Sequence, residues 1–307
     1  MKKNILYFAI AAIVVLCNIS CGSEDDDVVT GKPVYNLPEY ANKAVAFTIP
    51  NGVTSAENAN AKLTGMNFTE SGKAVFEVTE SGVKKYAIYN VKIDGGTYNI
   101  TSDNGKNIGT VVSTTTRGSS STTVNVDVKF EINGVIYTYK TTDPVAAKMT
   151  YDAMSGGDNL NNIARTWKPR SMKLTLEGDI TPLSMIEYSG KLSSFVEEVK
   201  KRDTGFSPSD IDELNKDVKS ITFDKTGMFS IEYVEGTCDV ANWKWSDSNY
   251  ANIALSLKEK TMGNKFIQDN SKVGVKFTTN TCLITLSTQL TGGSNNQYTA
   301  TLQVNLE

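Results

Sequence analysis

The chain has 307 residues, with 31 Lys and Arg against 34 Asp and Glu, and its net charge at neutral pH is −3. Nucleic-acid-binding proteins usually present a basic face, so this balance argues against a nucleic-acid partner. The sequence contains no histidine, which excludes Ser-His-Asp and Cys-His nucleophile activation and every histidine-ligated metal centre. We therefore expect a protein that is not an enzyme and that uses no cofactor or metal.

Residues 1–20 are typical of a signal peptide. Lys2 and Lys3 precede an apolar run at residues 5–16. This run is too short to cross a bilayer, which requires about 20 apolar residues. The small residue Ser20 stands directly before Cys21, where a signal peptidase could cut. One interpretation is an ordinary secretory signal in which Cys21 has no special role.

The other interpretation is a lipid anchor. Residues 18–21, Asn-Ile-Ser-Cys, resemble a bacterial lipobox, although Asn18 stands where that pattern usually has Leu. The resemblance implies that Cys21 is lipidated and becomes the mature N-terminus, and each buried methylene of a lipid chain contributes about 0.8 kcal/mol to membrane binding. The next charged residues form an acidic run: Glu24, Asp25, Asp26 and Asp27.

Such a run stays solvated, and residues 21–40 therefore read as a lipidated cysteine followed by a flexible tether. The acidic run also resembles the export signal of Gram-negative lipoproteins that reach the outer leaflet of the outer membrane. This resemblance implies a protein held by acyl chains in outer-membrane lipid and facing the cell exterior.

Residues 41–145 have the pattern of an antiparallel β domain, either a barrel or a sandwich. Short runs rich in β-branched and aromatic residues are separated by glycine-containing turns, and Asn133-Gly134 is the strongest hairpin signal. Pro50 and Gly52 should end the first strand. Strands are expected at residues 44–49, 61–68, 74–79, 85–93, 97–101, 111–116, 124–132 and 135–140.

Residues 143–162 show no strand pattern, so we place a domain boundary there and a second β domain at 160–307. Two helices near 191–218 should interrupt its strands, the first indicated by apolar residues with helical spacing from Leu192 to Val199 and the second by an N-cap at Ser207-Pro208. Strands are expected at residues 171–177, 220–223, 228–234, 241–245, 252–257, 273–278, 282–288 and 298–306.

A weak internal repeat links the two halves. Residues 66–77 align with residues 221–232, and both read as strand, polar turn with glycine, strand. Two origins remain open for this repeat, a true duplication or hairpins that converged on one pattern.

The second half resembles bacterial lipocalin-like lipoprotein domains. Residues 164–168, Ala-Arg-Thr-Trp-Lys, resemble the Gly-Thr-Trp opening of that family, with Arg165 in the usual place of Gly. Residues 221–229 and 241–245 resemble its second hairpin and its Trp strand. The resemblance implies a lipocalin-like β domain on a surface lipoprotein, and it implies no particular reaction.

Two residue pairs are candidates for special roles. Trp243 and Trp245 would share one face of a strand, where they form either a stacking platform for a sugar or lipid or part of the core.

Cys238 and Cys282 follow the signal segment and lie in strand-like runs. In an oxidising compartment they would form either a disulfide or two buried thiols.

Paired carboxylates are the catalytic chemistry that the composition leaves open. Glu177 with Asp179, or Glu232 with Glu235, could serve a glycoside hydrolase if either pair faced across a cleft. The turn that begins at Asp103 is rich in oxygen ligands but lacks the spacing of an EF-hand, so a plain turn is expected there.

The sequence thus predicts a lipid-anchored cell-surface protein that captures a small lipophile or a glycan without catalysis. The first alternative is an accessory or structural subunit of an outer-membrane transport or adhesion complex, bound to an outer-membrane protein partner. The second alternative is a carboxylate-dependent hydrolase.

Overall fold

The computed structural model describes residues 43–115, 121–151, 154–178, 185–189, 217–257, 272–291 and 297–307. These residues belong to one compact unit, Val34–Glu307. Cys21, the acidic run and the tether lie outside the described residues, as do residues 191–216, where most of the two-helix prediction falls. Within the ranges given above, no helix is long and apolar enough to cross a membrane.

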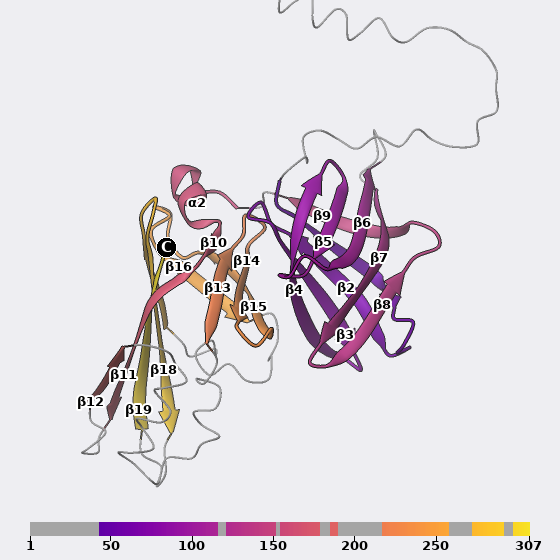
Figure 1. Ribbon diagram of the computed structural model, residues 1–307. Helices are drawn as coiled ribbons and strands as arrows, with labels where there is room; N and C mark the ends of the chain where they lie inside the picture. Colours follow the sequence, from indigo (N-terminus) through magenta and orange to yellow (C-terminus); the bar gives the residue numbers. More distant parts are fainter. Residues whose placement is uncertain are drawn as a thin grey trace, which may run out of the picture. The chain divides into compact units, whose positions relative to one another are not determined.

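The first half of the described chain is a closed antiparallel β-barrel (Figure 1, indigo to magenta). Strands β1 to β6 pair in sequence order, β6 pairs with β7, and β9 closes the ring of eight by pairing with both β7 and β1. Strand β8 pairs with the other end of β7. The strands are β1 Val45–Thr54, β2 Ala61–Phe68, β3 Lys73–Glu80, β4 Val83–Asp94, β5 Thr97–Thr101, β6 Asn107–Thr115, β7 Thr122–Ile132, β8 Val135–Lys140 and β9 Val145–Tyr151.

The barrel interior is packed with aromatic side chains. Strand β7 alternates buried and more exposed residues along its length, as a strand with one face in a core must. Phe68 stacks on Tyr98 with ring centroids 4.1 Å apart, and Phe76 stacks on Phe130 at 4.8 Å. Since an eight-stranded barrel is just wide enough for side chains to fill, these rings occupy the space in which a lipocalin would hold a ligand.

Two features of the barrel differ from the expectations. Strand β1 does not end at Pro50 but continues to Thr54 through a register shift between Thr48 and Val53. Proline is tolerated at such irregularities, and Gly52 adopts the positive φ of 64° that the chain needs there. Strand β9, where no strand was expected, extends the barrel past residue 145 to Tyr151.

The described residues of the second half form a short helix and two five-stranded antiparallel sheets. Helix α2 spans Gly157–Ile163. The first sheet has the order β10-β13-β14-β15-β16, with strands β10 Thr166–Trp167, β13 Val218–Phe223, β14 Met228–Tyr233, β15 Cys238–Trp245 and β16 Ile253–Leu257. The second has the order β12-β11-β19-β18-β17, with strands β11 Pro169–Gly178, β12 Met185–Ser189, β17 Lys272–Phe277, β18 Cys282–Thr291 and β19 Gln297–Leu306.

The two sheets share one hydrophobic core. Trp167, Phe229 and Trp243 from the first sheet pack in the same cluster as Ile284 and Leu306 from the second. No strand pairing joins the two sheets within the described chain, so the closed barrel lies in the first half and not in the half that resembles lipocalin-like domains. Val218, expected on a helix, begins strand β13 instead, because it pairs with Tyr233 in the sheet.

Candidate functional site

The two halves of the internal repeat fold into hairpins with the same turn, β2–β3 and β13–β14. In each hairpin the amide of the turn glycine donates to the carbonyl three residues earlier, Gly72 to Thr69 at 3.1 Å and Gly227 to Asp224 at 3.0 Å. The two glycines have φ values of 82° and 86°, in the left-handed region that favours glycine. The repeat therefore marks one turn structure that the chain uses twice.

The two hairpins contact each other directly. The Asn67 side-chain amide on β2 donates to the Thr226 hydroxyl at 2.7 Å. Lys225 and Glu70, which occupy equivalent positions in the repeat, form an ion pair of 2.8 Å. The repeat thus supplies part of the contact between the barrel and the C-terminal half.

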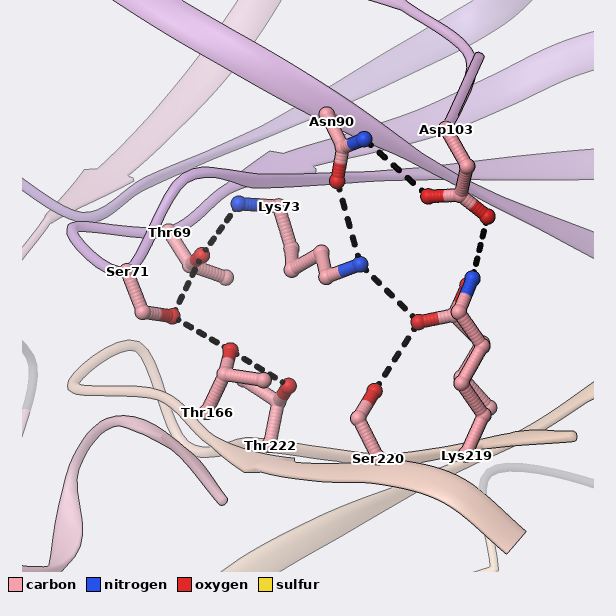
Figure 2. Close-up of polar contacts among 10 residues, drawn as sticks. Thr69, Ser71, Lys73, Asn90, Asp103, Thr166, Lys219, Ser220 and Thr222 are labelled. Carbon is pink, nitrogen blue, oxygen red and sulfur yellow. Dashed lines mark hydrogen bonds and ion pairs between the residues drawn. The ribbon is translucent and has the colours of Figure 1, made fainter. Parts of the chain in front are cut away.

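A chain of hydroxyl groups continues this contact (Figure 2). The hydroxyls of Thr69 and Ser71 are 3.0 Å apart, those of Ser71 and Thr166 are 2.8 Å apart, and those of Thr166 and Thr222 are 2.9 Å apart. The first two residues belong to the barrel and the last two to strands β10 and β13. Each hydroxyl can both donate and accept a hydrogen bond, so the four hydroxyl groups provide hydrogen-bond partners for one another across the contact.

A buried glutamate lies at the centre of a neighbouring ion cluster, which consists of Lys73, Asn90, Asp103, Lys219, Ser220 and Glu232. One carboxylate oxygen of Glu232 accepts from Lys73 Nζ at 2.9 Å and from the Ser220 hydroxyl at 2.9 Å, and the other accepts from Lys219 Nζ at 2.6 Å. The Glu232 side chain is only 7% exposed. Burial opposes its charge, but the hydrogen bonds from Lys219 and Lys73 hold the Glu232 pKa below its ordinary value.

Asp103 and Asn90 complete the ion cluster on the barrel side (Figure 2). Asn90 accepts from Lys73 Nζ at 3.1 Å and donates to Asp103 at 3.1 Å, while Lys219 pairs with Asp103. The hydrogen bond from Lys219 lowers the pKa of Asp103. Burial disfavours the charge of Lys219, yet its bonds to Asp103 and Glu232 raise its pKa. At neutral pH Glu232, Asp103 and Lys219 are therefore charged and mutually compensated.

A second carboxylate, Asp224, is buried in the turn of the β13–β14 hairpin and is 3% exposed. It accepts from the Thr226 hydroxyl at 2.5 Å and from the Thr226 amide at 3.2 Å. Burial nevertheless raises the pKa of Asp224 to about 6. The side-chain oxygen of the nearby Asn67, Oδ1, is buried and has no hydrogen-bond partner among the described residues. Unlike Glu232, Asp224 carries a poorly compensated charge.

Next to the ion cluster the barrel and the β14–β15 hairpin enclose a groove of about 600 Å³, which we call the junction groove. Asp103 and Glu232 of the ion cluster form part of its wall. The remaining lining comes from the start of β4, the β5–β6 turn, the β7–β8 turn and the β14–β15 turn, at residues 83–89, 102, 131–134 and 235–239.

Exposed apolar side chains gather at the turns that border the junction groove. Val83 lines the groove itself and is 57% exposed. Val135 and Ile136 directly follow the lining residues of the β7–β8 turn, and Val234 directly precedes those of the β14–β15 turn. Of the five large apolar residues exposed in the described chain, one therefore lines the groove and three follow or precede its lining residues in the sequence, the fifth being Tyr151. A concentration of this kind is typical of an interaction site.

Tyr89 fixes one side of the groove. Its hydroxyl donates to the Glu131 carbonyl at 3.2 Å and accepts from the Glu131 amide at 3.2 Å, so a side chain of β4 is bound to the main chain at the end of β7. Burial raises the pKa of Tyr89, which keeps its hydroxyl protonated and able to donate. The Glu131 carboxylate remains exposed beside the groove.

The two tryptophans do share a strand face, as predicted, but that face is the core and not an open platform. Trp243 is 2% exposed, and its indole N–H donates to the Asp224 carbonyl at 2.9 Å. Trp245 packs against Trp243 with ring centroids 5.2 Å apart and donates to the Ser155 carbonyl at 2.5 Å. Neither lines the junction groove. Of the two alternatives, Trp243 therefore takes the one of a core residue, and the half-buried Trp245 packs against that core.

The structure joins Cys238 and Cys282 by no disulfide. Cys238 begins β15 and lines the junction groove, whereas Cys282 begins β18 in the other sheet and lies in the shared core. Burial raises the pKa of the Cys282 thiol to about 12, which leaves it protonated and unreactive.

The candidate carboxylates are placed differently from their predicted roles. Glu232 is held by two lysines, and both Glu232 and Glu235 line the junction groove. Asp103, in the turn considered for calcium, pairs with Lys219. Glu177 is exposed, and its proposed partner Asp179 lies outside the described residues. In the described part of the chain no group of three or more Cys, Asp or Glu side chains could hold a metal ion.

Comparison with known proteins identifies no relative. No family model matches the chain, and no curated protein matches it. Among solved structures, a chain of the K. pneumonia MrkH–c-di-GMP complex is similar over 76% of this chain and 79% of that chain, with 9% sequence identity and a TM-score of 0.15. So low a TM-score supports no conclusion about fold or ligand.

Proposed function

We propose that this chain is a lipid-anchored cell-surface binding protein that captures its ligand without catalysis, and that the junction groove is its binding site. The observation that carries the proposal is the groove itself, whose volume of about 600 Å³ is in the range of ligand sites. Its lining combines charged, amide and aromatic groups with apolar side chains, which suits a ligand that has both polar and apolar parts. A glycan meets this requirement better than a simple lipophile.

A second candidate function is that of an accessory subunit docked to an outer-membrane protein. The exposed apolar residues at the turns that border the groove favour it, because Val83 and Val234 are 57% and 65% exposed where a soluble monomer would gain from polar residues. The same groove would then receive part of a protein and not a free glycan.

The groove is tested by a thermal-shift screen of the full chain in detergent against glycans, fatty acids, bile acids and peptides. A ligand at about 100 times its Kd adds about 2.7 kcal/mol to the free energy of unfolding. Thr237 lines the groove, so T237W should block it and abolish the shift, whereas T142W at an exposed site outside the lining should not. A ligand that stabilises wild type and T237W equally would contradict the assignment.

The anchor is tested separately. C21A removes the thiol that would be acylated, so the variant should move from the membrane fraction to the soluble fraction, as judged by immunoblotting after ultracentrifugation. C17A, which alters the other cysteine of the N-terminal segment, should remain in the membrane fraction. Membrane association of C21A would reject the lipid anchor.

A further inference from the structure

We propose that the junction groove binds an extended, basic and apolar segment of a partner polypeptide. This inference rests on the groove being the binding site, as in the proposed function, and it names a partner polypeptide, as in the second candidate function, in place of a glycan. Two properties of the groove carry it, the uncompensated acidic charge of its lining and the exposed apolar residues at its bordering turns.

The lining residues that are left after the internal ion pairs are subtracted carry negative charge. Lys84 and Lys85 pair with Glu77 and Glu80, which stand outside the lining. Asp103 and Glu232 are likewise compensated by lysines of the ion cluster.

A fifth lining carboxylate, Asp239, is half-buried and accepts from the Tyr233 hydroxyl at 2.6 Å. The two that remain, Glu131 and Glu235, are exposed, and neither forms an ion pair with a described residue. A cationic ligand can neutralise the charges of these two carboxylates. A lysine or arginine side chain also has an aliphatic stem that can lie along apolar surface.

The apolar residues set the second requirement. Val83 lines the groove, Val234 directly precedes the lining residues of the β14–β15 turn, and both expose most of their side chains. An extended peptide places alternate side chains on opposite faces, so basic residues can reach the carboxylates while apolar residues cover the valines. A glycan has no comparable means of covering valines while neutralising carboxylates.

The probes are three short peptides with blocked ends: alternating lysine and valine, alternating glutamate and valine, and alternating lysine and serine. Binding to the full chain in detergent is measured by fluorescence polarisation at low and high salt. We expect the lysine–valine peptide to bind at least tenfold more tightly than either of the others, and to bind less tightly at high salt because the charges are screened.

Two matched variants connect this binding to the groove. E131Q/E235Q removes the exposed lining carboxylates and should weaken binding of the lysine–valine peptide about fivefold or more. D94N/D158N removes two exposed carboxylates outside the lining and should leave the Kd unchanged. Circular dichroism should give the same melting temperature for both variants, since all four positions are exposed.

The proposal is overturned if the three peptides bind alike, if none binds, or if E131Q/E235Q binds as wild type does. A glycan whose binding is abolished by T237W would reject the peptide but retain the groove as the binding site. Peptide binding that T237W leaves intact would reject the groove as well. The two proposals therefore fail in distinguishable ways.

Discussion

Replacing Glu232 by alanine should lower the free energy of unfolding by about 3–5 kcal/mol, the usual cost of breaking a buried ion pair by removing one partner. The Glu232 carboxylate accepts from Lys73, Lys219 and Ser220, and the Lys73 side chain is only 12% exposed. Removing the carboxylate would leave the ammonium groups of Lys73 and Lys219 with Asp103 as their one counter-charge within the ion cluster. The loss is measured by urea denaturation at neutral pH.

Two controls separate this effect from the removal of any glutamate. E235A alters an exposed carboxylate on the same β14–β15 hairpin and should change stability by less than about 0.5 kcal/mol. K73M/E232M removes one buried pair together and should cost less than E232A alone, since it leaves no uncompensated charge from that pair. A loss below about 1 kcal/mol in E232A would show that the ion cluster contributes little to stability.

Most of the strands could be predicted because their information is local. In β7, alternate apolar residues fix the face that is buried, and the Asn133-Gly134 turn fixes the register of the β7–β8 hairpin. Both turn residues adopt the positive φ values that the pattern predicts, 51° and 80°. Each of these signals lies within a few consecutive residues, so the strands and the turn can be predicted from the sequence alone.

The closure of the barrel could not be predicted, because it depends on distant partners. Strand β9 contains Lys148 and several half-exposed residues, and it is defined mainly by its pairing with β1, about a hundred positions earlier in the chain. The continuation of β1 beyond Pro50 likewise depends on its partner β2.

The candidate site was even less accessible from the sequence. Lys73 and Glu232 are 159 positions apart, and nothing near either residue indicates the other. The internal repeat is the feature of the sequence that points to this site, because the two hairpins that it marks are the ones in contact. The tryptophans were more conspicuous in the sequence, but large aromatic side chains are most often recruited to cores, as Trp243 is here.

Asp224 leads to the second large expected effect, a change of stability with pH. Its pKa in the folded protein is about 6, raised from 3.8 by burial, so the folded state binds the proton more tightly than the unfolded state does. The Asp224 contribution to stability is therefore most favourable below about pH 4, where the carboxyl is neutral in both states. It becomes less favourable as pH rises to about 6, because the unfolded state releases the proton while the folded state still holds it, and above about pH 6 the folded state carries the buried charge.

The size of this effect follows from the shift of about two pKa units, each worth about 1.36 kcal/mol, which gives a cost near 3 kcal/mol at neutral pH. D224N abolishes the titration while keeping an oxygen that can accept from Thr226. We expect D224N to be more stable than wild type by up to about 3 kcal/mol at pH 7, and this difference should shrink toward zero at pH 4. Urea denaturation at several pH values measures it, with exposed D94N as the variant that should show no such trend. A D224N protein that is less stable than wild type at pH 7, or whose difference from wild type does not vary with pH, would mean that the hydrogen bonds of Thr226 compensate the buried charge fully.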